Sequence, residues 1–373
     1  MKTENPHNYR ILISGGGTGG HVYPALAIAD AFRKKHPNSK IEFVGAEGRM
    51  EMEKVPQYGY EIHGLWISGI QRKNMWKNFL LPFKILSSWM KVRKIIKAFK
   101  PDVVVGVGGY ASGPLLHIAA MQKIPSLIQE QNSYPGITNK ILAKKANTIC
   151  VAYDGLEKFF PANKLVVTGN PVRDFGKNLD ALKSEAYKYF GLNPNLPVIL
   201  IVGGSLGARS INQAILQNIK QVENQPVQFL WQTGKFYFED IQKSLSAKHE
   251  NIHIKAFIDK MEYAYAVADI VVSRAGAISI SELSMVGKPV ILIPSPNVAE
   301  DHQTKNAQVL EKENAAILIK DSQAMTELVH CMLLLANDKN RQNSLAQNIL
   351  KLAKPNAAER IVEEIEKLIA KRK

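Results

Sequence analysis

The sequence has little of what exported and membrane-spanning proteins need. Its 373 residues include only two cysteines, Cys150 and Cys331, which cannot form a disulfide framework, so we expect a reducing compartment. Its apolar runs, such as Phe79–Phe83, are far shorter than the roughly 18 residues of a membrane-spanning helix. The first ten residues are polar, so we expect no signal peptide. The sequence predicts a protein that can touch a membrane without crossing it.

Several catalytic motifs are also missing. The chain has two glycine-rich loops, Gly15–Gly20 and Gly203–Gly207. Neither is followed by Gly-Lys-Ser/Thr, which excludes a P-loop nucleotide hydrolase. No Asp-x-Asp pair is available to hold a divalent metal against a diphosphate. His249–His253 fits the HExxH zinc pattern, but residues 252–257 alternate with the period of a strand, whereas that chemistry needs both histidines on one helix. We therefore expect no metal site and no other cofactor.

Length and charge are more informative. At roughly 150 residues per domain the chain predicts two domains, and 46% hydrophobic with 22% charged residues is an ordinary globular composition. The net charge is +15, and residues 1–170 carry 23 Lys and Arg against 11 Asp and Glu, a net +12. An anionic partner is expected for this half. Nucleic acid, an acidic lipid surface and a phosphorylated substrate all remain open on charge alone.

Short β-rich runs alternate with amphipathic helical segments along the whole chain, which predicts an α/β fold with parallel sheets covered by helices on both faces. Each half opens with a strand, a glycine loop and a helix, so we expect two Rossmann-like domains that face an interdomain cleft. Their expected bounds are 1–170 and 171–352. Residues 353–373 should form a C-terminal helix that packs back on the first domain.

The two glycine loops, Gly15–Gly20 and Gly203–Gly207, are candidate anion sites. A glycine loop at the start of a helix directs unpaired N–H groups and the positive helix end toward one spot. The alternative for each is a simple tight turn. The first loop also fits the dinucleotide fingerprint, but the acidic residue expected about 20 positions on would be Glu42, inside a strand pattern. An NAD-dependent oxidoreductase is therefore a weaker alternative.

Polar residues follow several of the predicted strands. His21 comes directly after the first glycine loop, where the helix dipole disfavours the imidazolium, so we expect a neutral ring that can accept a proton. The alternative is a helix-start residue that is hydrogen-bonded locally. Strand ends of parallel sheets share one edge, where ligands bind. The further candidates at these edges are Tyr110, Glu130, Asn132, Arg173 and Glu282, each of which alone could be a loop cap.

The segment Arg72–Lys100 carries nine basic residues and no acidic one. Aromatic and aliphatic residues such as Trp76, Phe79 and Phe83 lie between them. This mixture is typical of a segment that lies on an anionic membrane surface. The alternative is a packed helix with a solvated basic face. We see no base-reading or stacking motif in the sequence and expect no nucleic-acid partner.

Taken together, the motifs resemble one family, the GT-B glycosyltransferases of peptidoglycan synthesis. These enzymes move N-acetylglucosamine from UDP to a lipid-linked muramyl-pentapeptide. The resemblance covers nearly the whole chain and rests on Gly15–Pro24, Gly106–Pro114, Glu130–Asn132, Gly169–Arg173, Gly203–Arg209, Phe257–Met261 and Arg274–Glu282, followed by Asp301–Ala307. It implies an inverting hexosyltransferase that converts lipid I to lipid II at the cytoplasmic face of the inner membrane. It also implies a role in cell wall biogenesis, and so in cell shape and division.

The resemblance implies site residues in both domains. Ile258 would meet the uracil through its backbone, Glu282 would hold the ribose hydroxyls, and Gln303 would read the transferred sugar. The remaining donor contacts that it implies are Thr18, Gly19, Gly20, Asn132, Arg173, Ser205, Ala277, Ile278, Ser279, Ile280 and Ser281. The acceptor contacts that it implies are Gly17, Thr18, Gly19 and Tyr110.

His21 and Glu130 are the two candidate general bases, chosen by their placement alone. UDP would leave with its charge stabilised by Arg173, Ser205 and a helix N-terminus. Two positions depart from many relatives: Gln129 stands in place of a histidine and receives no role, and His302 replaces a second glutamine, which leaves that sugar contact open. The alternatives are a UDP-sugar 2-epimerase on the same fold and a basic nucleic-acid-binding protein.

Overall fold

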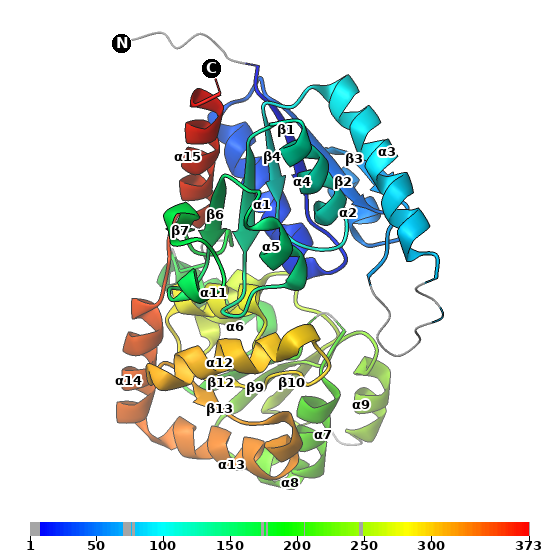
Figure 1. Ribbon diagram of the computed structural model, residues 1–373. Coiled ribbons are helices and arrows are strands. Elements are labelled where there is room, and N and C mark those ends of the chain that lie inside the picture. The colour runs from blue at the N-terminus through cyan, green and yellow to red at the C-terminus, as the bar shows by residue number, and fades with distance from the viewer. Residues whose placement is uncertain are drawn as a thin grey trace, which may run out of the picture. The chain divides into compact units, whose positions relative to one another are not determined.

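The computed structural model describes residues 8–69, 76, 79–172, 175–176, 178–204, 206–245 and 249–372. The chain divides into two compact units. The first comprises Met1–Arg173 together with Asn356–Lys373, and the second comprises Asp174–Pro355. Each unit contains one parallel sheet with helices on both faces (Figure 1), which confirms the predicted α/β class and the two Rossmann-like folds.

The first sheet has the strand order β3-β2-β1-β4-β5-β6-β7. Its strands are β1 (Arg10–Ser14), β2 (Lys40–Ala46), β3 (Glu61–Leu65), β4 (Val103–Gly106), β5 (Ser126–Glu130), β6 (Thr148–Val151) and β7 (Leu165–Val167). The order reverses between β1 and β4, because the chain turns from one side of the sheet to the other there. Parallel sheets open a ligand crevice at such a reversal. The loop after β1 is the first glycine loop, Gly15–Gly20. The loop after β4 contains Gly108 and Gly109.

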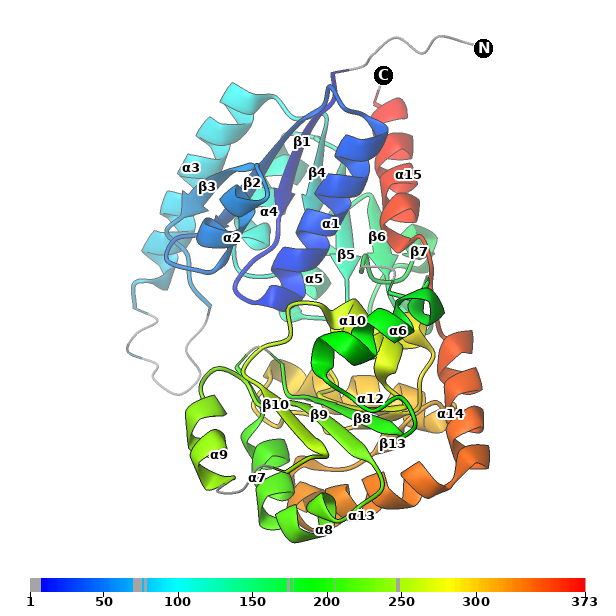
Figure 2. The same ribbon diagram turned by 180° about the vertical axis from the view of Figure 1, so that it is seen from behind.

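Two cores cover the faces of the first sheet. Ile11 and Ile13 of β1 point to one face, and Leu12 points to the other. The helices of this unit are α1 (Gly19–Lys35), α2 (Glu51–Gln57), α3 (Leu81–Phe99), α4 (Ser112–Met121), α5 (Ile137–Leu142) and α15 (Ala357–Ala370). The first core is closed by α1, α2 and α15, and the second by α3, α4 and α5. Figures 1 and 2 show α15 alongside α1 in both views.

The C-terminal helix is held to the first unit by more than apolar packing. Glu366 accepts hydrogen bonds from Lys35 Nζ at 2.8 Å and lies 2.6 Å from His36 Nε2 at the end of α1. Arg360 donates to the carbonyl of Val167 at 2.7 Å. The structure thus places Asn356–Lys373 in the first unit, although these residues follow the second unit in sequence.

The second sheet has the strand order β10-β9-β8-β11-β12-β13. Its strands are β8 (Val198–Val202), β9 (Gln228–Gln232), β10 (Ile252–Lys255), β11 (Ile270–Ser273), β12 (Val290–Leu292) and β13 (Ile317–Leu318). Its helices are α6 (Leu179–Phe190), α7 (Arg209–Gln217), α8 (Ile219–Glu223), α9 (Phe238–Ser244), α10 (Met261–Val267), α11 (Ala277–Val286), α12 (His302–Lys312), α13 (Ala324–Asn337) and α14 (Lys339–Lys351). The order reverses between β8 and β11, so the second glycine loop lies at this unit's reversal.

Details of single elements add to the sequence predictions. From the sequence, a helix is expected over Trp89–Phe99; α3 begins earlier, at Leu81, and Pro82 lies in its first turn, where the missing N–H of proline costs nothing. The edge strand β3 was not predicted, since Glu61–Leu65 mixes polar residues with a glycine. His253 lies in β10, as expected, and the described part of the chain holds no group of three side chains suited to a metal ion. Among the described helices, none is long and apolar enough to span a bilayer.

The packing of α15 predicts that Ile365→Ala weakens the first unit. Ile365 is fully buried against α1 and the sheet, so its truncation should lower the free energy of unfolding by about 2–5 kcal/mol. Urea unfolding followed by circular dichroism measures the loss. The exposed Glu363→Ala on the same helix serves as the control and should change stability by less than about 0.5 kcal/mol. Equal stability of the two variants would show that α15 is dispensable to this core.

Candidate functional site

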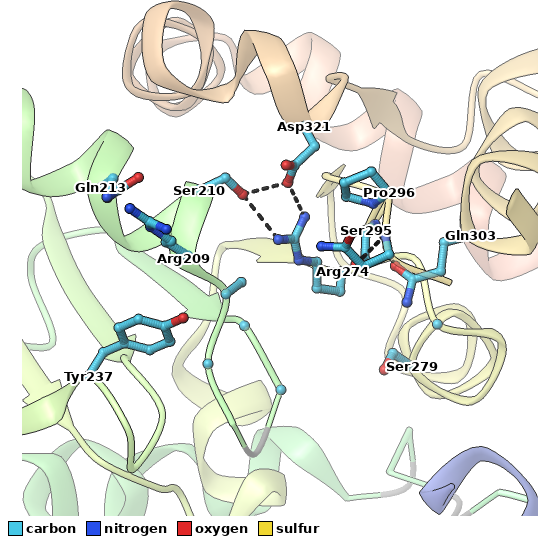
Figure 3. Close-up of a pocket in the computed structure, with 16 residues that line it drawn as sticks. Arg209, Ser210, Gln213, Tyr237, Arg274, Ser279, Ser295, Pro296, Gln303 and Asp321 are labelled. Atoms are coloured by element: carbon cyan, nitrogen blue, oxygen red, sulfur yellow. Dashed lines mark hydrogen bonds and ion pairs between the residues drawn. The ribbon is translucent and has the colours of Figure 1, made fainter. Parts of the chain in front are cut away.

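The second unit contains an open pocket of about 620 Å³ at the carboxyl ends of β8 and β11. Its walls are the second glycine loop, the start of α7, the residues between β12 and α12, and η5 (Asp321–Gln323). Ser279 and Gln303, two of the predicted donor residues, line it (Figure 3). The structure thus brings together in one pocket the glycine loop and two polar residues that lie 70 to 100 positions further along the chain.

Gln303 has a fixed amide orientation in this pocket. Its Oε1 accepts a hydrogen bond from the backbone N–H of Ser295 at 2.8 Å. Because the amide carbonyl is engaged, the NH₂ group is what Gln303 can offer to a ligand. A donor of this kind suits a hydroxyl or carbonyl oxygen of a sugar.

Arg274 braces the pocket wall, a role that the sequence did not predict. Its guanidinium pairs with the carboxylate of Asp321 and donates to Ser210 Oγ at 3.0 Å, as the dashed lines in Figure 3 show. It also donates to the carbonyl of Ile293 at 3.1 Å. These contacts connect the ends of β11 and β12 with α7 and η5. Since Asp321 compensates the charge, Arg274 fixes the shape of the pocket rather than adding a free cation to it.

Gln232, at the end of β9, joins two loops that were expected to contact the donor. Its Nε2 donates to the carbonyl of Gly204 at 3.1 Å, and its Oε1 accepts the N–H of Ile258 at 2.8 Å. The side chain is almost fully buried. The N–H of Ile258 is therefore engaged within the protein. A uracil that used this backbone N–H would have to displace Gln232. No motif pointed to this glutamine.

The start of α11 faces the same pocket through Gly276 and Ser279. Ala277, Ile278 and Ser279 form the first turn, where the positive end of the helix dipole lies. Two of the predicted donor residues serve the helix instead: the Ile280 side chain is buried in the core, and Ser281 Oγ donates to the carbonyl of Ala277 at 3.0 Å. Only the backbone of Ile280 is thus placed to meet a ligand, and its donor contact stays a prediction.

Glu282 lies on the second turn of α11, half-buried and close to Tyr265. Burial, and then the negative charge of Glu282, raise the pKa of the Tyr265 phenol, so that this hydroxyl stays protonated at all physiological pH values. The other two predicted donor residues of this region, Arg173 and Ser205, lie outside the described residues.

In the first unit, the first glycine loop and the loop after β4 touch backbone to backbone. Gly109, in the loop after β4, has φ +87°, and a Cβ at this position would lie 2.3 Å from the carbonyl oxygen of Gly16. Only glycine permits this approach. Tyr110 is half-exposed, and its ring lies near Gly17. The predicted acceptor residues of both loops are therefore neighbours.

His21 lies in the first turn of α1, beside these loops. Its Nδ1 is 3.1 Å from the carbonyl oxygen of Gly16 and 3.3 Å from Thr18 Oγ1. The ring packs on Gly108, where a Cβ would come within 2.8 Å of Nε2. The structure thus fixes the imidazole against the first glycine loop and the loop after β4.

Gly17 does not match its expected role fully. Its N–H donates to Glu51 Oε2 at 2.9 Å, so this group is not available to a phosphate of the acceptor. Glu51 was missed by the sequence analysis, because it lies in a short helix, α2, that no motif covers. The amide groups of Thr18 and Gly19 remain the candidates for an anion at this loop.

Glu130, the other predicted general base, holds the loop after β5 in place. Its carboxylate is buried and accepts four hydrogen bonds. The donors are the backbone N–H groups of Asn132 (3.0 Å) and Gly136 (3.0 Å) and the side-chain amides of Asn132 (3.2 Å) and Asn139 (2.8 Å). With both oxygens occupied in this way, Glu130 orders the loop that presents Asn132. His21 remains as the candidate base.

Gln129, to which no role was assigned, belongs to a buried amide cluster. Its Nε2 donates to Asn170 Oδ1 at 3.0 Å, and its Oε1 accepts from Gln131 Nε2. Asn170 in turn donates to the carbonyl of Gln131 at 3.1 Å. The cluster satisfies these polar groups within the first unit, which gives Gln129 a structural role.

Comparison with known families matches both units. The model of the glycosyltransferase family 28 N-terminal domain matches residues 11–151, and that of the family 28 C-terminal domain matches residues 198–361. The chain belongs to glycosyltransferase family 28. The resemblance inferred from the sequence is thereby confirmed.

Relatives of this family 28 protein cover nearly its whole length. It is 56% identical over 98% of the chain and 99% of the relative to the "UDP-N-acetylglucosamine--N-acetylmuramyl-(pentapeptide) pyrophosphoryl-undecaprenol N-acetylglucosamine transferase" of Flavobacterium psychrophilum. It is 54% identical to the protein of the same name from Christiangramia forsetii, over 96% of the chain and 98% of the relative.

Solved structures agree with this assignment. The crystal structure of Acinetobacter baumannii MurG matches with a TM-score of 0.79 and 29% identity, over 96% of this chain and 99% of that one. A UDP-GlcNAc 2-epimerase from Neisseria meningitidis matches with a TM-score of 0.65 and 20% identity, over 96% and 100% of the two chains. The second likeness shows the shared fold alone.

The four hydrogen bonds to Glu130 predict a stability effect for Glu130→Gln. The amide NH₂ cannot accept, so donors that now share one carboxylate oxygen lose their acceptor. We expect the free energy of unfolding to fall by about 1–3 kcal/mol, measured by urea unfolding. The exposed Glu157→Gln in the same unit is the control. Unchanged stability together with an altered pH–rate profile would restore Glu130 as the base.

Proposed function

We propose that this family 28 enzyme transfers N-acetylglucosamine from UDP-N-acetylglucosamine to the 4-hydroxyl of the muramyl sugar of undecaprenyl-pyrophosphoryl-muramyl-pentapeptide. This is the step from lipid I to lipid II in peptidoglycan synthesis, and through it the enzyme serves cell wall biogenesis, cell shape and cell division. The observation that carries the proposal is the 56% identity over nearly the full length to a transferase of that name.

The donor binds the second unit in this proposal. The transferred sugar lies in the pocket, where the amide NH₂ of Gln303 donates to it. Glu282 accepts from the ribose hydroxyls, a pairing that suits a carboxylate and a diol. The diphosphate lies against the second glycine loop and the first turn of α11, with Arg173 and Ser205 as its side-chain partners. Helix N-termini and charge-assisted hydrogen bonds stabilise such anions by on the order of 1–3 kcal/mol each.

The acceptor binds the first unit, and His21 is the base. The acceptor's pyrophosphate lies over the first glycine loop beside Tyr110. His21 takes the proton of the attacking hydroxyl, the hydroxyl oxygen bonds to the anomeric carbon, and the bond from that carbon to UDP breaks with inversion. Asn132 and the Thr18–Gly20 loop complete the donor contacts. No metal or cofactor is assigned to this reaction.

We also propose that α3 and the residues before it bind an anionic membrane surface at the cytoplasmic face. Phe83, Leu86 and Met90 lie on one face of α3, and each exposes more than half of its surface. Trp76 and Phe79 are exposed at 91% and 77%. Lys84, Lys91, Arg93, Lys94 and Lys97 lie on the same helix. Large exposed apolar side chains next to cations suit an interfacial position. Lys100 follows the last residue of α3, and the other three basic residues of this stretch, Arg72, Lys73 and Lys77, lie outside the described residues.

A transfer assay tests the reaction. Purified protein, radiolabelled UDP-N-acetylglucosamine and a short-chain lipid acceptor are mixed with a chelator present, and label should move into the lipid. His21→Gln should lower kcat by roughly 10²- to 10⁴-fold, the usual contribution of a general base. The exposed His330→Gln is the control and should leave kcat unchanged. Conversion of the donor to its 2-epimer without acceptor would instead assign the protein to the epimerases.

Vesicle binding tests the membrane proposal. The wild-type protein should sediment with vesicles that contain phosphatidylglycerol and much less with neutral ones. The double variant Phe83→Glu, Leu86→Glu should weaken binding at least tenfold, because burying each apolar side chain contributes about 1.5–3 kcal/mol. Leu334→Glu, an exposed leucine of α13, is the control. Equal binding by the two variants would contradict an interfacial role for α3.

A further inference from the structure

A buried carboxylate lies under the first glycine loop, and the proposed mechanism does not use it. Glu51 is the first residue of α2, and its side chain is fully buried. Oε1 accepts the N–H of Ala46 at 3.0 Å, and Oε2 accepts the N–H of Gly17 at 2.9 Å. A buried charge adds little net stability even when its partners are present. Stability alone therefore does not account for a carboxylate at this point.

The loop is built around this carboxylate. A Cβ at Gly16 would lie 2.1 Å from Glu51 Oε1, and a Cβ at Gly45 would lie 2.6 Å from Glu51 Cγ. Both contacts are shorter than carbon atoms tolerate, so any larger residue at either position would displace the side chain. Two glycines from different loops thus leave room for one carboxylate.

A single peptide group connects Glu51 to His21. The peptide between Gly16 and Gly17 donates its N–H to Glu51, and its carbonyl oxygen lies 3.1 Å from His21 Nδ1. A carbonyl oxygen can only accept, so Nδ1 carries the proton of this hydrogen bond. In the neutral ring the lone pair then lies on Nε2.

We infer that Glu51 is a positioning residue that sets the tautomer of His21 through the Gly16–Gly17 peptide. The inference rests on the proposed function, in which His21 is the base. Gly17 has φ +86°, and neither residue of the Gly16–Gly17 peptide has a side chain that fixes its orientation. In the opposite orientation the N–H would face His21 and the carbonyl would face Glu51. The carboxylate repels that carbonyl and accepts the N–H, so it keeps the peptide in one orientation.

The orientation matters to the proton transfer. With the carbonyl of Gly16 toward the ring, Nε2 takes the proton of the acceptor hydroxyl while its oxygen bonds to the anomeric carbon and UDP leaves. The imidazolium that forms keeps its Nδ1 proton in the hydrogen bond to Gly16. Glu51 polarises that carbonyl from the other end of the same peptide, which strengthens its hold on the positive ring. No proton passes to Glu51, because the peptide N–H between them does not ionise.

Nuclear magnetic resonance on the wild-type protein tests the tautomer directly. The nine histidines are labelled with ¹⁵N in their rings, and the His21 signal is assigned by its loss in His21→Gln. At a pH where the ring is neutral, we expect the Nδ1–H tautomer. An Nε2–H tautomer in the wild-type protein overturns the inference without any change at position 51.

The variant Glu51→Gln tests whether Glu51 sets the tautomer of His21. The amide has the size of the carboxylate, but only one of its two polar atoms can accept, so either Gly17 or Ala46 loses its acceptor. We expect a mixture of His21 tautomers and a fall in kcat of roughly 10- to 100-fold, as for other groups that orient a functional imidazole. The KM for UDP-N-acetylglucosamine should stay unchanged. An unchanged tautomer overturns the inference whether or not kcat falls, since loop damage alone can lower kcat.

Glu42→Gln is the matched control. Glu42 is a buried carboxylate of β2 in the same unit, but its partners are Lys40 and His63 rather than a glycine loop. We expect this variant to lose stability while the His21 tautomer and kcat stay as in the wild type. The same tautomer change in both variants would assign it to general loosening of the unit and overturn the inference.

His21→Gln separates this inference from the proposed function. Full turnover in that variant removes His21 as the base and so overturns the mechanism. The tautomer signal in Glu51→Gln still reports on the peptide in that case, because it does not depend on turnover. The two proposals can therefore fail independently.

Discussion

The first unit depends on the contact between two glycine loops at the point where its strand order reverses. Gly109 lies against the carbonyl of Gly16, and the N–H of the same peptide, that of Gly17, donates to Glu51. His21 and Tyr110 lie on this double loop. A site built from backbone contacts has few degrees of freedom, because the N–H of Gly17 and the carbonyl of Gly16 are already committed to neighbours.

In the second unit, side chains rather than backbone contacts hold the loops in place. Gln232 joins its glycine loop to Ile258, and Arg274 joins α7 to η5 through Ser210 and Asp321. Both side chains are buried or nearly so, and neither carries charge into the pocket uncompensated. Two units with similar strand orders thus preorganise their loops by different means, one through a buried carboxylate and the other through an amide and an ion pair.

Much of this could be predicted from the sequence, because strand and helix periods and the two glycine loops are local signals. The fold class follows from them, and the family follows from the resemblance of motifs such as Gly15–Pro24 and Arg274–Glu282. These motifs also point to His21 and Tyr110 in the first unit and to Ser279 in the second. The roles of individual residues did not follow. Glu130 has the position of a base, but its four donors come from residues up to nine positions away, and no pattern in the chain reveals their convergence. Glu51, Gln232 and Arg274 act through contacts between distant segments, which a single sequence does not show.

The return of α15 to the first unit has a consequence for synthesis on the ribosome. Ile361 and Ile365 complete the core beneath α1, yet they are translated only after the entire second unit. The second unit can therefore close its core while the nascent chain is still growing. The first unit exposes part of its apolar face until α15 has been synthesised, and exposed apolar surface of this kind favours aggregation during folding.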